Sequence, residues 1–355
     1  MKRYVLVLLS FTVGFFVAGV AWGVWSLRLR DQRIARSTPL RVVCGENWLS
    51  AQALEKFSLE HNVRIEQYTY AHPSDFLRQM ANADGKVDLV CTSSLLVRSL
   101  IRSRWLRKSD FASLSNVKLL AVDFTHLPYD PDLQYTVPLF WNLYGFFGKG
   151  DLPKLTTWKQ TWLNKKVSLW GDELNLLHLM NSLHLNAEER LVEEQTSEGI
   201  GLAFKKFTKS SVRFLKPETT PIAAEAMTAD VDWIQLPLGR VARLLGKDSP
   251  YRFWLPEDGA TVDVGVLAIG ERSAQPELAR LLINELLATN EALNTHLQLA
   301  TGVLHVSLSG LSSITDLQKP EALRQFPLNR LHFPDLDVQD LPSFQKAFDG
   351  SSDSQ

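Results

Sequence analysis

The sequence predicts an α/β protein built from two lobes, and three observations lead to this prediction. Strand-like and helix-like segments alternate from residue 40 to about residue 101, a second alternation begins near Trp158, and 355 residues is the length of about two domains. The chain is 45% apolar with two cysteines, so it can bury a core without disulfide bonds. With 38 basic and 39 acidic side chains, it has no excess of positive charge for binding nucleic acid.

The first 38 residues are predicted to form a membrane anchor or signal segment with a linker. Residues 4–27 contain no charged side chain, and at about 1.5 Å per residue a helix of that length crosses a bilayer core of about 30 Å. Lys2 and Arg3 precede this run, as in a secretory signal, and Gly19–Ala21 offers small residues for cleavage. The length of the run favours an uncleaved transmembrane helix, which leaves residues 39–355 in the periplasm, tethered to the inner membrane. Cleavage and a soluble periplasmic protein are the alternative.

The first block has the order strand, helix, strand, helix, strand, helix. Ser50 is expected to cap the first helix and Ser74 the second, and Gly85 is placed to end the second. The apolar and alternating runs predict strands at Leu40–Cys44, Val63–Tyr70 and Val87–Cys91. Apolar stripes predict helices at 51–61, from Ser74 towards Gly85, and through Leu96, Leu100 and Ile101.

The second block repeats the alternation and ends in further helices. Strands are predicted at Val167–Trp170, Val231–Leu236 and Val262–Ile269. Helices are predicted from Asp172 to about Leu185, from Gly239 to about Leu245, at 276–288 and at 290–300. A proline-punctuated segment follows to Phe348, and residues 349–355 are expected to be a disordered tail.

This order predicts a parallel sheet with helices on both faces, in which ligands bind beyond the carboxyl ends of the strands. Those ends are the segments Gly45–Trp48 and Thr92–Ser94. Cys44 and Cys91 each close a strand, where they are either buried small side chains or partners in a disulfide.

No catalytic residue, metal site or cofactor is predicted. The chain lacks the GxxxxGK[ST], GxSxG and HExxH patterns. His178 and His184 lie six residues apart on a predicted helix, a spacing that does not place two imidazoles on one face. Nothing in the sequence therefore indicates an enzyme.

The order of several segments resembles the bacterial extracellular solute-binding proteins of ABC importers, of the polyamine (spermidine/putrescine) type. The resemblance covers roughly residues 39–305 and is carried by order and spacing rather than by one motif. Its segments are Asn47–Trp48, Val87–Val90 with Ser93–Ser94, Tyr135–Pro138 with Trp141, Thr157–Trp162, Trp254–Pro256 with Gly259, and Val266–Ile269.

The resemblance implies a type II periplasmic-binding-protein clamshell in which two lobes close over a ligand. Lobe one would comprise residues 39–142 and 266–348, and lobe two residues 143–265. The two crossings between the lobes would fall near Asn142–Phe147 and near Val264–Leu267.

The resemblance also implies a ligand site lined by six residues, Trp48, Ser93, Ser94, Asp172, Gln235 and Asp263. In polyamine binders aromatic rings enclose the methylene chain and carboxylates meet the ammonium ends. Here Leu95 stands where the family has a tyrosine, Asn175 replaces an acid, Gln235 replaces a tryptophan, and the acid expected at Gly265 is absent. Asp263 lies two residues earlier on the same strand face and could supply that charge.

Alternative roles remain open for three of these positions and for nearby aromatics. Asp172 is either a ligand contact or a helix N-cap, and Asp263 is either a ligand contact or a solvated strand end. Trp48 either stacks on the ligand or belongs to the core. Trp141, Trp233 and Trp254 are expected in the core.

The sequence therefore predicts a monomeric solute-binding protein that captures a small polar cationic or zwitterionic solute and delivers it to ABC permease subunits. The alternative is a membrane-tethered sensor or interaction domain on the same fold without transport.

Overall fold

The computed structural model describes residues 37–46, 48–70, 73–83, 85–120, 124–149 and 250–288. It also describes shorter stretches at 157–158, 160, 167–170, 213–215, 233–241, 304–305 and 331–332, and isolated positions between residues 19 and 34.

The alternation predicted for the first block is confirmed. Strand β1 and helix α2 follow each other as expected, and the parallel pairing of β1 with both β2 and β3 gives the predicted local sheet. The elements are β1 (Leu40–Gly45), α2 (Ala51–His61), β2 (Ile65–Tyr70), α3 (Pro73–Asn82), β3 (Leu89–Ser93) and α4 (Ser94–Arg102).

One of the two predicted helix caps is confirmed and the other is wrong. The Ser50 hydroxyl accepts a hydrogen bond from the Ala53 N–H at 3.3 Å, as an N-cap should. Helix α3 begins at Pro73, so Ser74 lies inside the helix rather than before it. Proline is favoured at the first helical position because its fixed φ suits the helix and its missing N–H has no partner there. Gly85 follows α3 with φ +64°, the left-handed conformation expected beyond a helix end.

Two short 3-10 helices and one long strand connect the first block to the second. The second block contains both helices and strands. The remaining elements are η1 (Phe111–Ser113), η2 (Val117–Leu119), β4 (Thr136–Lys149), β5 (Val167–Trp170), β6 (Arg213–Leu215), β7 (Trp233–Pro237), α8 (Leu238–Val241), β8 (Tyr251–Trp254), β9 (Ala260–Ile269), α9 (Pro276–Ala288), β10 (Leu304–His305) and β11 (Leu331–His332).

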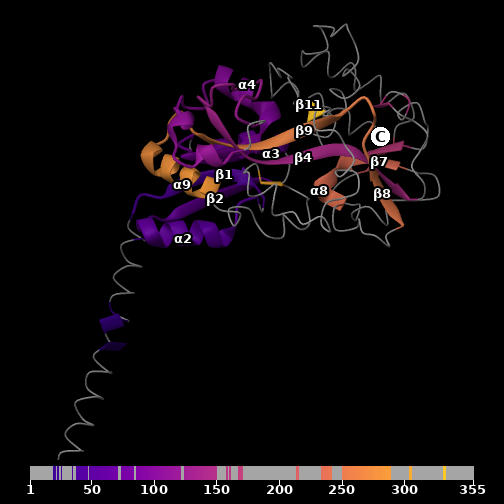
Figure 1. The fold of residues 1–355 in the computed structure, drawn as a ribbon. Coiled ribbons are helices and arrows are strands. Elements are labelled where there is room, and N and C mark those ends of the chain that lie inside the picture. The colour runs from indigo at the N-terminus through magenta and orange to yellow at the C-terminus, as the bar shows by residue number, and fades with distance from the viewer. Residues whose placement is uncertain are drawn as a thin grey trace, which may run out of the picture.

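The strands form a continuous sheet in the order β2-β1-β3-β9-β4-β7-β5-β6. At each end of the sheet the neighbouring strands pair in parallel. In the middle, β9 pairs antiparallel with both β3 and β4, and β4 pairs antiparallel with β7. The sheet is thus mixed rather than parallel throughout, because β9 returns from the second block between strands of the first. Figure 1 shows β4 and β9 as long strands that run from the side of α2 and α9 to the side of β7 and β8.

Helices cover both faces of the first part of the sheet, as predicted. Leu54 and Phe57 of α2 and Leu282 and Leu286 of α9 belong to a core cluster that includes Val42 of β1. Phe76 and Met80 of α3 and Leu96 and Leu100 of α4 belong to the cluster on the other face, which includes Val43. Successive strand residues point to opposite faces, so β1 supplies both cores.

A buried carboxylate fastens α9 to the sheet. Asp88, which is 1% exposed, accepts a hydrogen bond from the Arg41 N–H of β1 at 2.8 Å. Its other oxygen accepts from the Ser273 hydroxyl at 2.6 Å and from the N–H groups of Ala274 and Gln275, both at 3.0 Å. These N–H groups lie at the start of α9, where the helix dipole also favours a negative charge.

Two of the segments that carry the family resemblance meet in the second block. Trp158 is fully buried, and its indole N–H donates to the Gly259 carbonyl at 2.8 Å. Its backbone N–H donates to the Asp258 carboxylate at 3.1 Å, and burial raises the pKa of Asp258 above its ordinary value. The Thr157–Trp162 and Trp254–Gly259 segments are therefore joined in space through Trp158.

Cys44 and Cys91 are free thiols on the neighbouring strands β1 and β3, and each is 1% exposed. Both belong to the same core cluster, which agrees with the expectation of buried small side chains. Burial raises the pKa of the Cys91 thiol well above its ordinary value, and the nearby Cys44 raises it further.

The folded protein is expected to resist alkylation at both cysteines. Iodoacetamide must reach a thiolate to react, and both thiols are buried; in addition, the raised pKa of the Cys91 thiol leaves it almost no thiolate at pH 8. Intact-mass measurement should show no adduct in the native protein and two adducts after unfolding in guanidinium without reductant. A native mass about 2 Da lower, with no adduct after unfolding, would instead show that the two thiols form a disulfide.

Several predicted segments lie outside the described residues. They include most of the anchor at 4–27, the helices from Asp172 to Leu185 and at 290–300, most of the segment to Phe348, and the tail 349–355. Trp22 and Trp25 are described and exposed, and their ring centroids lie 5.3 Å apart. Within the described part of the chain, no helix is both long enough and apolar enough to span a membrane.

Candidate functional site

Three of the predicted site residues lie in contact. Ser93 ends β3 and caps α4, with its hydroxyl oxygen accepting from the Leu95 N–H at 3.2 Å. The same hydroxyl donates to Oδ1 of Asp263 at 2.6 Å. The Ser94 hydroxyl lies 3.5 Å from the same oxygen and accepts from the Val264 N–H at 3.3 Å. The turn from β3 into α4 therefore presents two hydroxyls to one carboxylate of β9.

Strand pairing explains why these residues meet. Ser93 lies directly opposite Gly265 in the antiparallel pair of β3 and β9. Asp263 is two residues earlier on β9, so its side chain leaves the sheet on the same face as the Gly265 position. Asp263 is 7% exposed, which is inconsistent with the alternative of a solvated strand end.

Gly265 itself has no room for the acid that the family resemblance places there. A Cβ at this position would lie 2.2 Å from the Phe140 ring, so any side chain would displace that ring. The Phe140 ring packs edge to face on Trp48, with ring centroids 4.8 Å apart. The Phe140 ring thus occupies the space of the missing acid, and Asp263 places a carboxylate two residues away on the same strand face.

Trp48 is held by aromatic contacts at the carboxyl end of β1. Its ring covers Gly45, where a Cβ would lie 2.3 Å from the indole, and it contacts Tyr70 with centroids 6.0 Å apart. The residue is half-buried and packs against the core, so part of its surface remains accessible. Trp48 therefore belongs in part to the core, and whether it also stacks on a ligand stays a prediction.

The structure also brings two tyrosines near Asp263 that the sequence did not single out. Burial raises the pKa of both Tyr70 and Tyr129 well above the ordinary value for a phenol, and the charge of Asp263 contributes to each shift. Tyr70 donates its hydroxyl proton to the Cys91 carbonyl at 2.9 Å. No sequence pattern identifies Tyr129, since it lies in an irregular segment that only the tertiary fold places beside β9.

Gln235 is not in contact with this group. It is fully buried on β7, opposite Phe146 of β4, whereas Asp263 is opposite Asn142 of the same strand. Four residues of strand separate those two positions, which is about 13 Å along β4. Asp172 lies outside the described residues, so its choice between ligand contact and N-cap stays a prediction.

The three tryptophans that were expected in the core are mostly buried. Trp141 and Trp233 are 4% and 5% exposed, and Trp254 is half-buried against Phe146 with centroids 5.5 Å apart. They contribute to the core around β4 rather than to the group formed by Ser93, Ser94 and Asp263.

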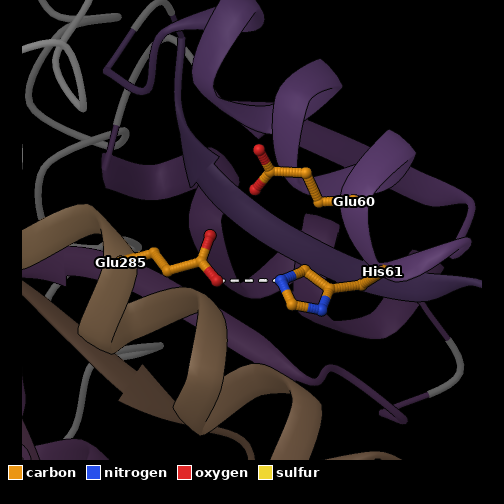
Figure 2. Close-up of side chains that lie close together, drawn as sticks. All are labelled: Glu60, His61 and Glu285. Carbon is orange, nitrogen blue, oxygen red and sulfur yellow. Dashed lines mark hydrogen bonds and ion pairs between the residues drawn. The ribbon is translucent and has the colours of Figure 1, made fainter.

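One group of possible metal ligands lies elsewhere, between α2 and α9. One ligand atom from each of Glu60, His61 and Glu285 lies within 4.8 Å of the other two. Figure 2 shows the His61 ring facing Glu285, with Nε2 2.8 Å from Oε1, and the Glu60 carboxylate beside them. All three side chains are partly or fully exposed, and the contact between His61 and Glu285 is accounted for as a surface interaction that joins the two helices.

Comparison with known proteins finds similarity to polyamine-binding proteins. The chain is 28% identical over 113 residues to the spermidine/putrescine-binding periplasmic protein of Escherichia coli (strain K12), covering 31% of this chain and 32% of that protein. It is 24% identical over 246 residues to the protein of the same name from Salmonella typhimurium, covering 67% of this chain and 70% of that protein. The predicted resemblance is confirmed. The first match spans only about a third of the relative's length, and no family model matches the chain.

The fold is shared more widely than the sequence. The spermidine/putrescine ABC transporter substrate-binding protein PotD from Streptococcus pneumoniae superposes with a TM-score of 0.66, covering 90% of this chain and 99% of that one. Their sequences are 14% identical, so this likeness concerns the fold. The chain therefore shares the α/β fold of that structure.

Proposed function

We propose that the protein is an extracytoplasmic solute-binding protein that captures a small polar cation, such as a polyamine, and delivers it to an ABC importer. The similarity to spermidine/putrescine-binding periplasmic proteins supports the solute class, and the shared fold supports the mode of binding. The residues proposed to line the site are Trp48, Ser93, Ser94, Asp172, Gln235 and Asp263.

The observation that carries this proposal is the buried carboxylate of Asp263, which leaves β9 on the same face as the Gly265 position, where the Phe140 ring packs against the half-buried Trp48. An ammonium group removed from water needs a countercharge, and Asp263 is a buried acid within β9 that faces the turn from β3 into α4. Aromatic rings attract cations through their faces and pack on methylene chains. A carboxylate, two hydroxyls and an aromatic pair form a set that suits an alkyl ammonium.

The long strands β4 and β9 are proposed as the crossings between two lobes, formed by residues 39–142 with 266–348 and by residues 143–265. Strand β4 pairs with β7 and β8 of the second block, strand β9 pairs with β3 of the first block, and the two long strands pair with each other. A bend in such shared strands would let the lobes close over the solute. The closed form is what a permease would recognise.

The protein is proposed to act in the periplasm as a monomer that docks on permease subunits. The curated relatives are periplasmic proteins, which supports this location. The uncharged run at residues 4–27 supports a tether in the inner membrane, with Trp22 and Trp25 near its basic boundary.

Calorimetric titration tests the proposed function. Putrescine and spermidine should each bind the purified protein with a dissociation constant of about 10 μM or lower, equivalent to roughly −7 kcal/mol. Glutarate, an anion of similar size without an ammonium group, should show no heat of binding. Binding of glutarate without binding of either polyamine would contradict the proposal.

A further inference from the structure

Tyr129 is held firmly by its neighbours although it lies outside any helix or strand. The Pro128 carbonyl accepts a hydrogen bond from Nη2 of Arg98 on α4 at 2.9 Å. The Asp130 carboxylate accepts from the N–H groups of Gln134, Tyr135 and Thr136 at 3.0, 2.9 and 2.8 Å. Both residues that flank Tyr129 are therefore held in place, which constrains the backbone of Tyr129 between them.

The hydroxyl of Tyr129 is an unusual group in this setting. The residue is 8% exposed, and its hydroxyl oxygen is buried with no hydrogen-bond partner in the part of the chain that the structure describes. Leaving a buried hydroxyl unpaired costs about 1–3 kcal/mol. Tyr70 has the same side chain near the same carboxylate, but its hydroxyl is paired with the Cys91 carbonyl.

Asp263 lies close enough to influence this hydroxyl electrostatically. Burial is the main cause that raises the pKa of Tyr129, and the charges of Asp263 and Asp130 raise it further. The phenol therefore stays neutral and keeps both a proton to donate and an oxygen to accept. An alkyl ammonium carries three donors, which one carboxylate oxygen does not satisfy.

We propose that Tyr129 is a specificity-determining residue whose hydroxyl contacts the ammonium end of the solute that Asp263 binds. This role rests on the proposed function and extends it to a residue outside the predicted site. The unpaired hydroxyl gains its hydrogen bond only when the solute is present, so its burial cost is recovered on binding. The contact favours an ammonium over an alkyl group at the same position.

The substitution Tyr129→Phe separates this role from a structural one, because the two predict opposite effects on stability. Removing an unpaired buried hydroxyl should leave the urea midpoint unchanged or raise it. Affinity for putrescine and spermidine should fall roughly 10- to 100-fold, the range for a hydrogen bond to a charged group. Calorimetric titration and urea unfolding of the full chain give the two readouts.

Tyr68→Phe is the matched control. Tyr68 is half-buried on β2 and packs on the cluster of Val43 and Phe76, so its substitution should leave polyamine affinity within twofold of wild type. Wild-type affinity in Tyr129→Phe would overturn the role of Tyr129 alone. A lower urea midpoint in that variant would also overturn it, since the hydroxyl would then have a structural partner. Absence of polyamine binding by the wild-type protein would overturn the proposed function as well.

Discussion

Asp263→Asn is expected to reduce affinity for putrescine by roughly 30- to 900-fold, or about 2–4 kcal/mol, the loss typical of a truncated buried charge pair. The amide keeps the size of the carboxylate. It still offers an oxygen to the Ser93 hydroxyl, which in the wild-type protein donates to Oδ1 of Asp263 at 2.6 Å. What the variant loses is the negative charge that offsets the desolvation of an ammonium. Calorimetric titration measures the affinity, and far-ultraviolet circular dichroism checks the fold.

Asp132→Asn is the control for net charge. Asp132 is exposed in the segment before β4, so its substitution removes the same charge without touching the buried group. Its affinity should match that of the wild type at 0.15 M salt, where exposed charges more than about 8 Å from the solute are largely screened. Equal affinities of the wild type, Asp263→Asn and Asp132→Asn would show that the countercharge of the solute comes from another acid.

Asp88→Ala is expected to lower the free energy of unfolding by about 3–5 kcal/mol, among the largest effects of a single substitution. The change removes an acceptor shared by three N–H groups and one hydroxyl, and these donors lie in β1 and at the start of α9. Buried donors left without an acceptor carry their full desolvation cost. Urea unfolding followed by tryptophan fluorescence measures the difference.

Two further variants sharpen this prediction. Asp88→Asn should lower the free energy of unfolding by less than Asp88→Ala does. Its side-chain oxygen still accepts from the N–H groups that precede α9, and only the bond from the Arg41 N–H is lost, because an NH2 group stands in place of Oδ2. Glu271→Ala changes an exposed acid in the same loop and should stay within about 0.5 kcal/mol of wild type. A similar loss in Glu271→Ala and Asp88→Ala would indicate that net charge, rather than the buried acceptor, stabilises this part of the protein.

Local patterns were sufficient where neighbouring residues decide the structure. Ser50 caps α2 as predicted because an N-cap bonds within its own first turn. The prediction for Ser74 was wrong because Pro73 starts the helix one residue earlier, a preference that competes with capping at the same place. The strands β1, β3, β5 and β9 were located by their apolar runs. The bounds of β5 match the prediction, and the ends of the other three differ by at most two residues.

The sheet shows where a local pattern no longer suffices. Alternating strands and helices correctly indicated parallel pairing of β1 with β2 and β3. The antiparallel insertion of β9 between β3 and β4 joins positions more than 120 residues apart, as in the pairing of Thr136 with Ala268. Which distant strands pair depends on how the whole chain packs, and hydrophobic periodicity carries no information about it.

The sequence by itself determined the α/β class and most strands and helices of the first block, because these depend on short-range periodicity. The candidacy of Ser93, Ser94 and Asp263 came from the resemblance to polyamine-binding proteins. Only the tertiary structure decided that the three meet at one carboxylate, that Phe140 fills the space above Gly265, and that Tyr129 lies near Asp263. The reason is physical: side chains far apart in the chain come together only when long strands pair and cores pack to full density.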